Sequence, residues 1–357
     1  MCRARRTRGR PDGGAPGHRR RAIMHARTRI ALSAVGALTA AGFLAACGEA
    51  GSSGTEAPDA GASGAGCAPV AGDQLVVLTD DKKLQNTDNI VPAVNADAAS
   101  PQVIAALNRV SAALDTEKLI GLNRAVDVDR QTPQAAAEEF AAAEGLTDGI
   151  ETGPGGELIV GAANFSESET LGELYRIVLT AAGYDVTVQQ IGNRELYEPA
   201  LETGEIQVVP EYAATMADFI NNKVAGENAP AISSPDLDET MTGLREVGEQ
   251  VGIVFGEASA AQDQNAFAVT SAFADEYGVS TLSDLAEKCS GTATVLGGPP
   301  ECPQRPKCQE GLVEVYDFRA GEFSSLDAGG PQTKTALTTG EISVGLVFSS
   351  DGALATG

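Results

Sequence analysis

Histidine and tryptophan are scarce in this sequence, and their scarcity excludes several kinds of catalysis. Among 357 residues there are two His, both within the first 25 positions, and no Trp. A Ser–His–Asp triad, a Cys–His pair and a His-ligated metal site all require imidazole. We therefore predict no metal site, no cofactor and no enzyme activity. A catalytic pair of carboxylates stays open, because acidic residues are numerous.

Positive charge is also scarce beyond residue 46. Residues 1–46 hold ten of the 25 basic residues but only one of the 49 acidic residues, so the remainder is strongly acidic. Proteins that bind nucleic acid need a basic patch to neutralise phosphates, so we expect no nucleic-acid partner. The length is sufficient for about two domains with hydrophobic cores of their own.

The first 46 residues have the features of a leader and a secretory signal peptide. Basic residues follow Met24, and an uncharged run over 30–43 precedes small residues. A basic start, a short apolar segment and a small-residue cleavage site are typical of secretion signals. The apolar run is short for a membrane span. The sequence leaves open whether Met1 or Met24 is the natural start.

The segment Leu44-Ala45-Ala46-Cys47 resembles the lipobox of bacterial lipoproteins. The resemblance implies that Cys47 is lipidated, becomes the first residue of the mature chain and anchors it to the outer face of the membrane. The alternative is an ordinary cleaved signal in which this cysteine has no role. Residues 47–72 are rich in Gly, Ser and Ala, a composition typical of a flexible stalk.

The cysteines indicate two disulfides. Of six cysteines, the first lies in the leader and Cys47 is assigned to lipid, so four remain. An even number in an exported protein favours disulfides, with three possible connectivities. Two prolines stiffen the loop between Cys302 and Cys308, so we predict that these two pair, which leaves Cys67 with Cys289. A four-cysteine zinc site is the alternative, but no Cys-x-x-Cys pair is present.

Short apolar runs alternate with amphipathic segments from about residue 75 onward. We expect strands at 75–78, 158–161, 186–190, 206–209, 252–255, 266–269, 293–296 and 342–348. We expect helices at 101–114, 116–125, 133–144, 167–182, 195–203, 213–223, 235–251, 281–288 and 332–339. This alternation predicts an α/β protein with parallel sheets covered by helices, and ligands near the C-terminal ends of strands.

An ordered set of motifs resembles one family. The motifs are 159–167 (IVGAANFSE), 181–184 (AAGY), 199–206 (PALETGEI), 209–212 (VPEY), 263–269 (DQNAFAV), 298–301 (GPPE) with 305–306 (RP), and 347–352 (VFSSDG). The set is similar to the substrate-binding proteins of ABC importers for osmoprotectants, the glycine betaine, choline and proline betaine class, and it covers most of residues 75–357.

This resemblance implies both a fold and a function. The implied fold is two-lobed and periplasmic-binding-protein-like (type II), with a ligand cleft between the lobes that closes about a hinge. The implied function is capture of a small solute outside the membrane by a monomer, which delivers it to an ABC permease and its ATPase. A ligand-sensing surface lipoprotein and an exported enzyme on the same scaffold are the alternatives.

The order of the segments departs from the family. There, the segment after the 347–352 motif continues into a strand, an Asp-Asp-Lys sequence and three closing helices. Here these features come first, at 75–82 (LVVLTDDK) and 101–144. The order therefore resembles a circular permutation, and we expect Gly357 to lie near residues 72–75. The alternative is a fusion in which residues 75–144 form a separate domain.

The expected organisation follows from this order. It comprises a leader with signal peptide (1–46), a stalk (47–72), a permuted part of lobe 1 (73–146), a linker (147–156), lobe 1 (157–262), lobe 2 (263–347) and a return to lobe 1 (348–357).

The family's ligand-binding positions are only partly kept. The resemblance maps an aromatic cage for quaternary ammonium onto Asp88, Tyr212, Asn265 and Phe348, two of which are not aromatic. Two lost ring faces would weaken betaine binding roughly tenfold to several hundredfold. Arg305 matches a carboxylate-binding arginine. We therefore expect a small polar or zwitterionic solute that is not a tightly bound betaine. Asp88 would instead pair with a primary or secondary amine, or accept hydrogen bonds from hydroxyls.

Further candidate ligand-binding residues follow from their positions beside strands and crossings. They are Asn164, Phe165, Ser166, Arg194, Gln264 and Ser349. The first three follow a strand and open a helix, where backbone N–H groups point at a cleft; a helix-capping role is the alternative. Arg194 opens a helix, and the sequence favours neither a position in the cleft nor one on the surface. Gln264 lies where the chain is expected to cross between lobes.

Overall fold

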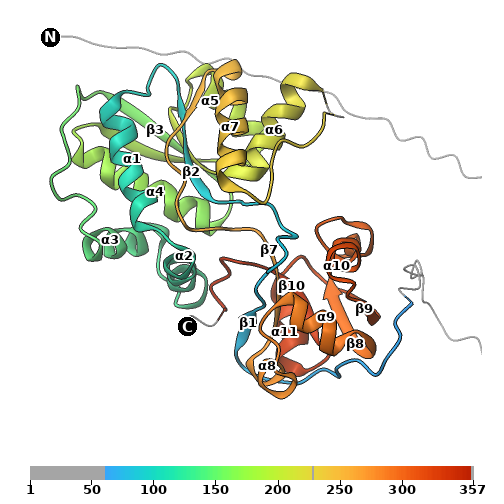
Figure 1. Ribbon diagram of the computed structural model, residues 1–357. Helices are drawn as coiled ribbons and strands as arrows, with labels where there is room; N and C mark the ends of the chain where they lie inside the picture. Colours follow the sequence, from blue (N-terminus) through green and yellow to red (C-terminus); the bar gives the residue numbers. More distant parts are fainter. Residues whose placement is uncertain (1–60, 227–228, 355–357) are drawn as a thin grey trace, which may run out of the picture. The chain divides into compact units, whose positions relative to one another are not determined.

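The computed structural model describes residues 61–226 and 229–354 (Figure 1). The predicted signal peptide, the lipidation site Cys47 and the first part of the stalk lie outside these residues. The described part forms two five-stranded sheets, with strand orders β4-β3-β5-β2-β6 and β1-β7-β10-β8-β9. We call the first sheet with its helices lobe 1 and the second lobe 2. The predicted α/β, two-lobed fold is confirmed.

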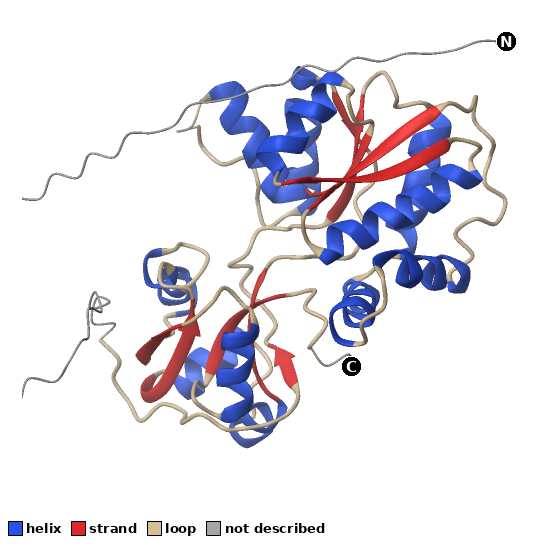
Figure 2. Ribbon diagram, turned by 180° about the vertical axis from the view of Figure 1, so that it is seen from behind, coloured by secondary structure: helices blue, strands red, loops and turns tan. Residues whose placement is uncertain are grey.

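Lobe 1 is built from five strands and seven α-helices of the described chain. The strands are β2 (Ile90–Asn95), β3 (Glu157–Ala163), β4 (Asp185–Gly192), β5 (Val208–Tyr212) and β6 (Ile253–Phe255). The helices are α1 (Pro101–Ala113), α2 (Thr116–Asn123), α3 (Pro133–Ala143), α4 (Ser166–Ala181), α5 (Arg194–Thr203), α6 (Ala213–Ala225) and α7 (Leu237–Val251), with a π-helical turn at Arg124–Val128. Helices cover both faces of the sheet (Figure 2).

Lobe 2 is built from five strands and four α-helices of the described chain. The strands are β1 (Leu75–Val77), β7 (Asn265–Thr270), β8 (Gly291–Gly298), β9 (Ala320–Ser325) and β10 (Val344–Phe348). The helices are α8 (Ser271–Tyr277), α9 (Leu282–Cys289), α10 (Gln309–Tyr316) and α11 (Pro331–Thr339), with a 3-10 turn at Cys302–Gln304. The strand β9 and the helices α8 and α10 were not predicted from the sequence.

Local sequence explains where the helices begin and end. Ser100 caps α1 by accepting a hydrogen bond from the N–H of Val103, and Pro101 occupies the first turn, where no N–H is needed. The helix α9 begins with a capping box between Thr281 and Asp284. The helix α7 ends at Gly252, whose φ of 72° is left-handed and suits glycine.

Alternation along the strands divides each core between two faces. In β5, the buried Val208 packs into the cluster beneath α1 and α4, whereas Val209 packs into the cluster beneath α6 and α7. In β7, Phe267 and Ala268 face different clusters in the same way. Successive side chains of a strand point to opposite faces, so both sheets are covered on both sides.

The sheets are mixed, which corrects the expectation of parallel sheets. The strand β3 is parallel to β4 and β5, and β8 is parallel to β9 and β10, as predicted. The strand β2 is antiparallel to β5 and β6, and β7 is antiparallel to β1 and β10. Each of these two strands enters its sheet from the other lobe, without the helical crossover that makes neighbouring strands parallel.

The strand β2 was not predicted from the sequence, and proline is unusual in a central strand. Pro92 nevertheless lies in the middle of β2, directly opposite Pro210 of β5. Its carbonyl accepts a hydrogen bond from the N–H of Gly256 on the other side. The N and C=O of an antiparallel residue point to the same side, so the missing donor of Pro92 points away from β5, and the β2–β5 ladder loses no hydrogen bond there.

The strand β1 lies in lobe 2, which corrects its assignment to lobe 1 as part of 73–146. Leu75 pairs with Thr270 of β7, and the N–H of Leu78 donates to the carbonyl of Phe267. Both leucines are buried in lobe 2 clusters. The chain therefore enters lobe 2 first and reaches lobe 1 only at β2.

The end of the described chain returns to α2 and β1. The amide of Asn123 donates to the carbonyl of Ser350, and Leu354 forms a parallel bridge with Leu75. Gly357, for which a position near residues 72–75 was predicted, lies outside the described residues. Within the described chain no helix has the length and apolar character needed to span a bilayer.

Both predicted disulfides are present. Cys67 is bonded to Cys289 across 222 residues of sequence, and Cys302 is bonded to Cys308 across six. The long-range bond joins the segment before β1 to the end of α9, and all four cysteines are buried.

Replacing both Cys67 and Cys289 with alanine should destabilise the protein by about 2–4 kcal/mol, because the bond restricts a long loop of the unfolded chain. Urea unfolding of the oxidised protein measures this loss. The matched control is the double alanine variant of Cys302 and Cys308, which opens a short loop and should lose less. An equal or larger loss in the control would contradict the expectation.

Candidate functional site

Two chain segments connect the lobes and are bonded to each other. Residues 78–89 lead from β1 to β2, and residues 256–264 lead from β6 to β7. The N–H of Asp263 donates to the carbonyl of Asp88 at 3.1 Å, and the N–H of Asp88 donates to Oε1 of Gln264 at 3.3 Å. Asn89 and Gln262 form an antiparallel bridge. The two segments therefore form one paired connection between the lobes, which we call the hinge region.

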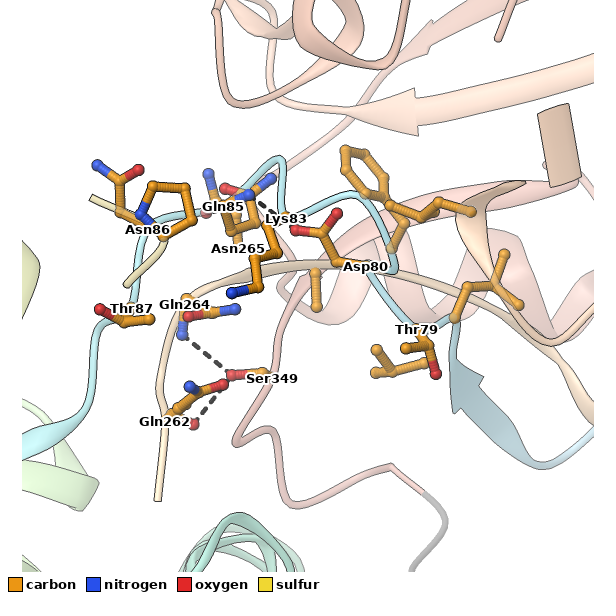
Figure 3. A pocket seen from close by; sticks show the side chains of 16 residues that line it. Thr79, Asp80, Lys83, Gln85, Asn86, Thr87, Gln262, Gln264, Asn265 and Ser349 are labelled. Atoms are coloured by element: carbon orange, nitrogen blue, oxygen red, sulfur yellow. Dashed lines mark hydrogen bonds between the residues drawn. The ribbon is translucent and has the colours of Figure 1, made fainter. Parts of the chain in front are cut away.

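Ser349, which follows β10, ties a third segment to this hinge. Its hydroxyl accepts from the N–H of Gln264 at 3.0 Å and donates to the carbonyl of Gln262 at 2.9 Å (Figure 3). The N–H of Ser349 also donates to the carbonyl of Gln264. Ser349, a predicted site residue, therefore contacts the backbone of the hinge region.

A cavity of about 410 Å³, which we call the Asp88 cavity, lies beside the hinge region. It is lined by Gln85, Asn86, Asp88, Ala214, Thr215, Asp218, Ala231, Ser233, Asp263, Gln264, Asn265, Lys307 and Phe348. These residues come from the connecting segments, from α6 and the loop after it, and from lobe 2. A concave site of this size, lined by convergent polar groups, is suited to a small molecule.

Two further cavities adjoin the Asp88 cavity. One of about 320 Å³, drawn in Figure 3, shares Gln85, Asn86, Gln264 and Asn265 with it. Another of about 300 Å³ contains Arg305 and shares Asn265 and Lys307 with it. Since Asn265 lines all three, it stands at the centre of the hollowed region.

Asp88 is a buried carboxylate in the cavity wall. Its Oδ1 accepts hydrogen bonds from the N–H of Thr215 at 3.0 Å and from the hydroxyl of Thr215 at 3.4 Å. Burial raises the pKa of Asp88 to about 6, although the bond from Thr215 and the nearby Arg194 act in the opposite direction. Asp88 therefore changes charge near neutral pH.

Arg194 lies behind the cavity wall instead of lining it, which corrects its assignment as a ligand-binding residue. Its Nε and Nη2 donate to Glu211 at 3.0 and 2.7 Å, and Nη2 also donates to the hydroxyl of Thr215 at 2.9 Å. Glu211 has no exposed side-chain surface and accepts a third bond from Tyr197. A bidentate arginine–carboxylate pair of this kind fixes geometry, and here it supports the residue that holds Asp88.

Tyr212 is also turned away from the cavity, although the resemblance placed it in the cage. Its hydroxyl donates to Oε1 of Glu167 at 2.6 Å, and its ring centroid lies 6.3 Å from that of Phe165. Asn123 donates to the other oxygen of Glu167. Burial raises the pKa of Glu167, and the hydrogen bond from Tyr212 opposes that rise. Tyr212 therefore serves a buried polar network.

Asp263 is a partly satisfied carboxyl of the cavity wall, and a hydrogen bond from the Ser350 side chain acts to lower its pKa. Its Oδ1 is buried without a hydrogen-bond partner among the described residues. Burial raises the pKa of Asp263 well above its ordinary value, and the Glu167 carboxylate adds to this rise. An unpaired buried oxygen costs free energy unless a donor reaches it.

Lys307 is the one basic side chain among the described residues that line the cavity. Its ammonium group donates to the carbonyl of Leu84 at 2.7 Å and to Oδ1 of Asn86 at 2.8 Å. Burial lowers the pKa of Lys307, while Asp80 and Asp218 act in the opposite direction. The lysine thereby joins lobe 2 to the connecting segment.

The structure brings together only part of the predicted site. Asp88, Gln264, Asn265 and Phe348 line the Asp88 cavity. Arg305 lies in the adjoining cavity with a side chain that is 65% exposed, 3.7 Å from Glu301. The predicted residues that do not line the Asp88 cavity are Asn164, Phe165, Ser166, Arg194, Tyr212, Arg305 and Ser349.

Asn164, Phe165 and Ser166 are positioned by the start of α4. The N–H of Asn164 donates to the carbonyl of Gly192, and the carbonyl of Ser166 accepts from the hydroxyl of Thr170. The ring of Phe165 is partly exposed. They do not line the Asp88 cavity, and the helix-capping alternative is not met either, because α4 begins without a side-chain capping hydrogen bond.

Sequence reasoning missed several lining residues, among them Asn86, Thr215, Asp218, Ser233, Asp263 and Lys307. Two of these lie within or beside the quoted motifs, so motif position was an available signal for Asp263 and Lys307. Asp218 lies on an amphipathic helix, where a polar residue is ordinarily solvent-facing. Its carboxylate holds the following loop by accepting from the N–H groups of Ile232 and Ser233.

Comparison with known proteins identifies the family. Residues 68–143 and 156–356 match a family described as the substrate binding domain of an ABC-type glycine betaine transport system. The chain belongs to this family. The resemblance inferred from the motifs is thus confirmed, and the family is one of solute-binding proteins.

The individual relatives have low sequence identity to this chain. A glycine-betaine-binding protein of Pseudomonas aeruginosa is 27% identical over 206 residues, which are 55% of this chain and 63% of that protein. The chain thus spans less than two thirds of that relative. Among solved structures, the murein tripeptide binding protein MppA of Escherichia coli is 13% identical, with a TM-score of 0.25 over 52% of this chain and 44% of its own. The oligopeptide-binding protein OppA is 9% identical, with a TM-score of 0.23 over 52% and 42%.

Substituting Arg194 with alanine should destabilise the protein by about 3–5 kcal/mol, because it leaves the buried Glu211 carboxylate without its partner. The free energy of urea unfolding measures the loss. The control is Arg305→Ala, which breaks an exposed pair and should change stability by less than about 1 kcal/mol. Similar losses in both variants would show that the Arg194–Glu211 pair has no special structural role.

Substituting Asp88 with asparagine should stabilise the protein at neutral pH. A carboxyl whose folded pKa is raised to about 6 from about 3.9 in the unfolded chain destabilises the fold above pH 6, by about 2–3 kcal/mol at pH 7. The cost shrinks as pH falls through 6 and disappears below about pH 4. Asparagine keeps the oxygen that Thr215 needs. Urea unfolding near pH 8 and near pH 4 tests this.

The control for this variant is Asp185→Asn, which removes the same charge from an exposed position on β4. It should show no gain that depends on pH over the same range. A stability change of Asp88→Asn that is the same at both pH values would contradict the raised pKa.

Proposed function

We propose that this protein is the extracytoplasmic solute-binding component of an ABC importer. It captures a small polar or zwitterionic solute in the Asp88 cavity and delivers it to the permease and its ATPase. The observation that carries this proposal is the position of the cavity: its walls come from both lobes and from both connecting segments. A solute bound there would bridge the lobes, so that hinge closure reports occupancy.

The cellular location in this proposal follows from the N-terminal sequence. The basic, apolar and small-residue segments up to residue 46 provide export, and Cys47 provides a lipid anchor on the outer face of the cell membrane. Residues 47–72 form the tether between the membrane and the folded body. The protein acts as a monomer, without a nucleic-acid partner and without enzyme activity.

The proposed order of segments is a circular permutation of the family's order. The family match in two segments, 68–143 and 156–356, supports it. So does the bridge between Leu354 and Leu75, which brings the last described residue to the start of β1. In this arrangement residues 147–156 link the family's C-terminal helices to its first strand, and β1 belongs to lobe 2.

The proposed solute is not a tightly bound betaine. Among the described residues that line the cavity, Phe348 is the one aromatic side chain. A quaternary ammonium is held mainly by aromatic faces, each worth about 0.5–2 kcal/mol. One face provides little of the affinity that a full cage would.

A thermal-shift screen of amines, betaines, amino acids, polyols and phenolics tests the proposed function. A solute present at about 100 times its Kd should add about 2.7 kcal/mol to stability and raise the melting temperature. The cavity-filling variant Ala231→Trp should abolish the shift. The matched control Ala225→Trp, at an exposed position near the end of α6, should retain it. A shift that survives Ala231→Trp would place binding elsewhere.

A further inference from the structure

We propose that the Asp88 cavity selects solutes whose cationic nitrogen carries at least one N–H proton. It holds that nitrogen against the carboxylates of Asp88 and Asp263, and it discriminates against quaternary ammonium groups. The inference rests on the proposed function, because it names the chemical class of the solute for the same cavity. It separates protonated primary, secondary and tertiary amines from fully methylated ones.

The charge of the cavity wall favours a cation. Three carboxylates line it, from Asp88, Asp218 and Asp263, against one ammonium group, from Lys307. The Asp218 carboxylate is already used, since it accepts from two backbone N–H groups and from the hydroxyl of Ser233. The other two carboxylates have capacity left for a ligand.

Asp263 provides the independent observation that points to a ligand. Asp263 lines the cavity, and its Oδ1 is buried without a hydrogen-bond partner among the described residues. Leaving such an oxygen unpaired destabilises the empty fold. A donor placed in the cavity would remove that cost, and an ammonium N–H is the donor that also compensates the charge.

Asp88 lies next to Asp263 in the paired segments. The backbone N–H of Asp263 donates to the backbone carbonyl of Asp88, so the two residues lie side by side on the paired segments. The bonds from the N–H and the hydroxyl of Thr215 both end on Oδ1 of Asp88, and a backbone hydrogen bond from Ala214 also favours the ionised form. The Thr215 bonds leave Oδ2 available to a ligand.

A trimethylated nitrogen cannot use these acceptors. It carries positive charge but no N–H, so Oδ1 of Asp263 would stay without a donor, and its methyl groups would keep the charge away from both oxygens. Its usual partners are aromatic faces, and Phe348 alone supplies one here. A site built to hydrogen-bond a ligand rejects an analogue that lacks the donor, because the site's polar groups remain unpaired.

The same geometry predicts a dependence on pH. Arg194 and Glu211 act on Asp88, and Glu167, Asp88 and Asp351 act on Asp263, so the pair sits in a mostly acidic surrounding. In the empty cavity this surrounding and burial favour protonated carboxyls. A bound cation favours the ionised form, so binding releases protons and affinity rises with pH.

The experiment is calorimetric titration with two series that differ only in N-methylation. One is glycine betaine, dimethylglycine, N-methylglycine and glycine; the other is choline, dimethylethanolamine and ethanolamine. In at least one series, the first replacement of a methyl group by N–H should strengthen binding at least tenfold at about pH 8. The affinity of that amine should fall as pH is lowered to about 5.

Two variants assign the effect to the named carboxylates. Asp88→Asn and Asp263→Asn should each weaken amine binding at least tenfold, and the former should flatten the pH dependence. The remote control Asp185→Asn should bind as the unmodified protein does. Thermal melting without solute checks that each variant is folded, and a variant that fails this check leaves the other to decide.

Three outcomes overturn the inference. One is a quaternary compound that binds as tightly as its N–H analogue, and another is amine binding that persists in both cavity variants. The third is an absence of amine binding at millimolar concentration while another class of solute from the screen binds in the Asp88 cavity, which leaves the proposed function standing. If the Asp88 cavity binds no solute of any class, both this inference and the proposed function are wrong.

Discussion

The pairing of the two connecting segments is the constraint on which the rest of the molecule depends. Residues 78–89 and 256–264 are hydrogen-bonded to each other, and each delivers an antiparallel strand into the sheet of the other lobe. The same segments supply Asp88, Asp263 and Gln264 to the cavity. The connection between the lobes, the sheet topology and the Asp88 cavity are therefore set by one short stretch of backbone pairing.

The buried carboxylates differ in how well they are paired. The Glu211 carboxylate is paired by Arg194 and Tyr197, whereas Asp263 has a buried oxygen without a partner among the described residues, and burial raises the pKa of Asp88. Well-paired buried charges fix geometry, and poorly paired ones destabilise the empty fold. Poorly paired carboxyls in a cavity wall, next to a well-paired buried charge outside it, are typical of a binding site.

The sequence was sufficient for much of the fold. Short apolar runs located β3, β5 and β7, and capping residues located helices such as α1 and α7, because these signals are local. It failed for β2, where Pro92 obscured a central strand, and for the lobe of β1, because pairing with β7 is a contact between residues nearly 200 positions apart. The prediction of parallel strands was wrong for β2 and β7, where the chain crosses between the lobes, for the same reason.

The site divides in the same way. Composition excluded imidazole chemistry, the cysteine pattern predicted both disulfides, and the ordered motifs identified the family, since each depends on residue type and order alone. Only the tertiary structure decided which motif residues face the cavity: Tyr212 turns to Glu167 and Arg194 turns to Glu211, while Asp263 and Lys307 face inward. The orientation of a side chain is set by the partners that burial brings to it, and those partners come from distant parts of the chain.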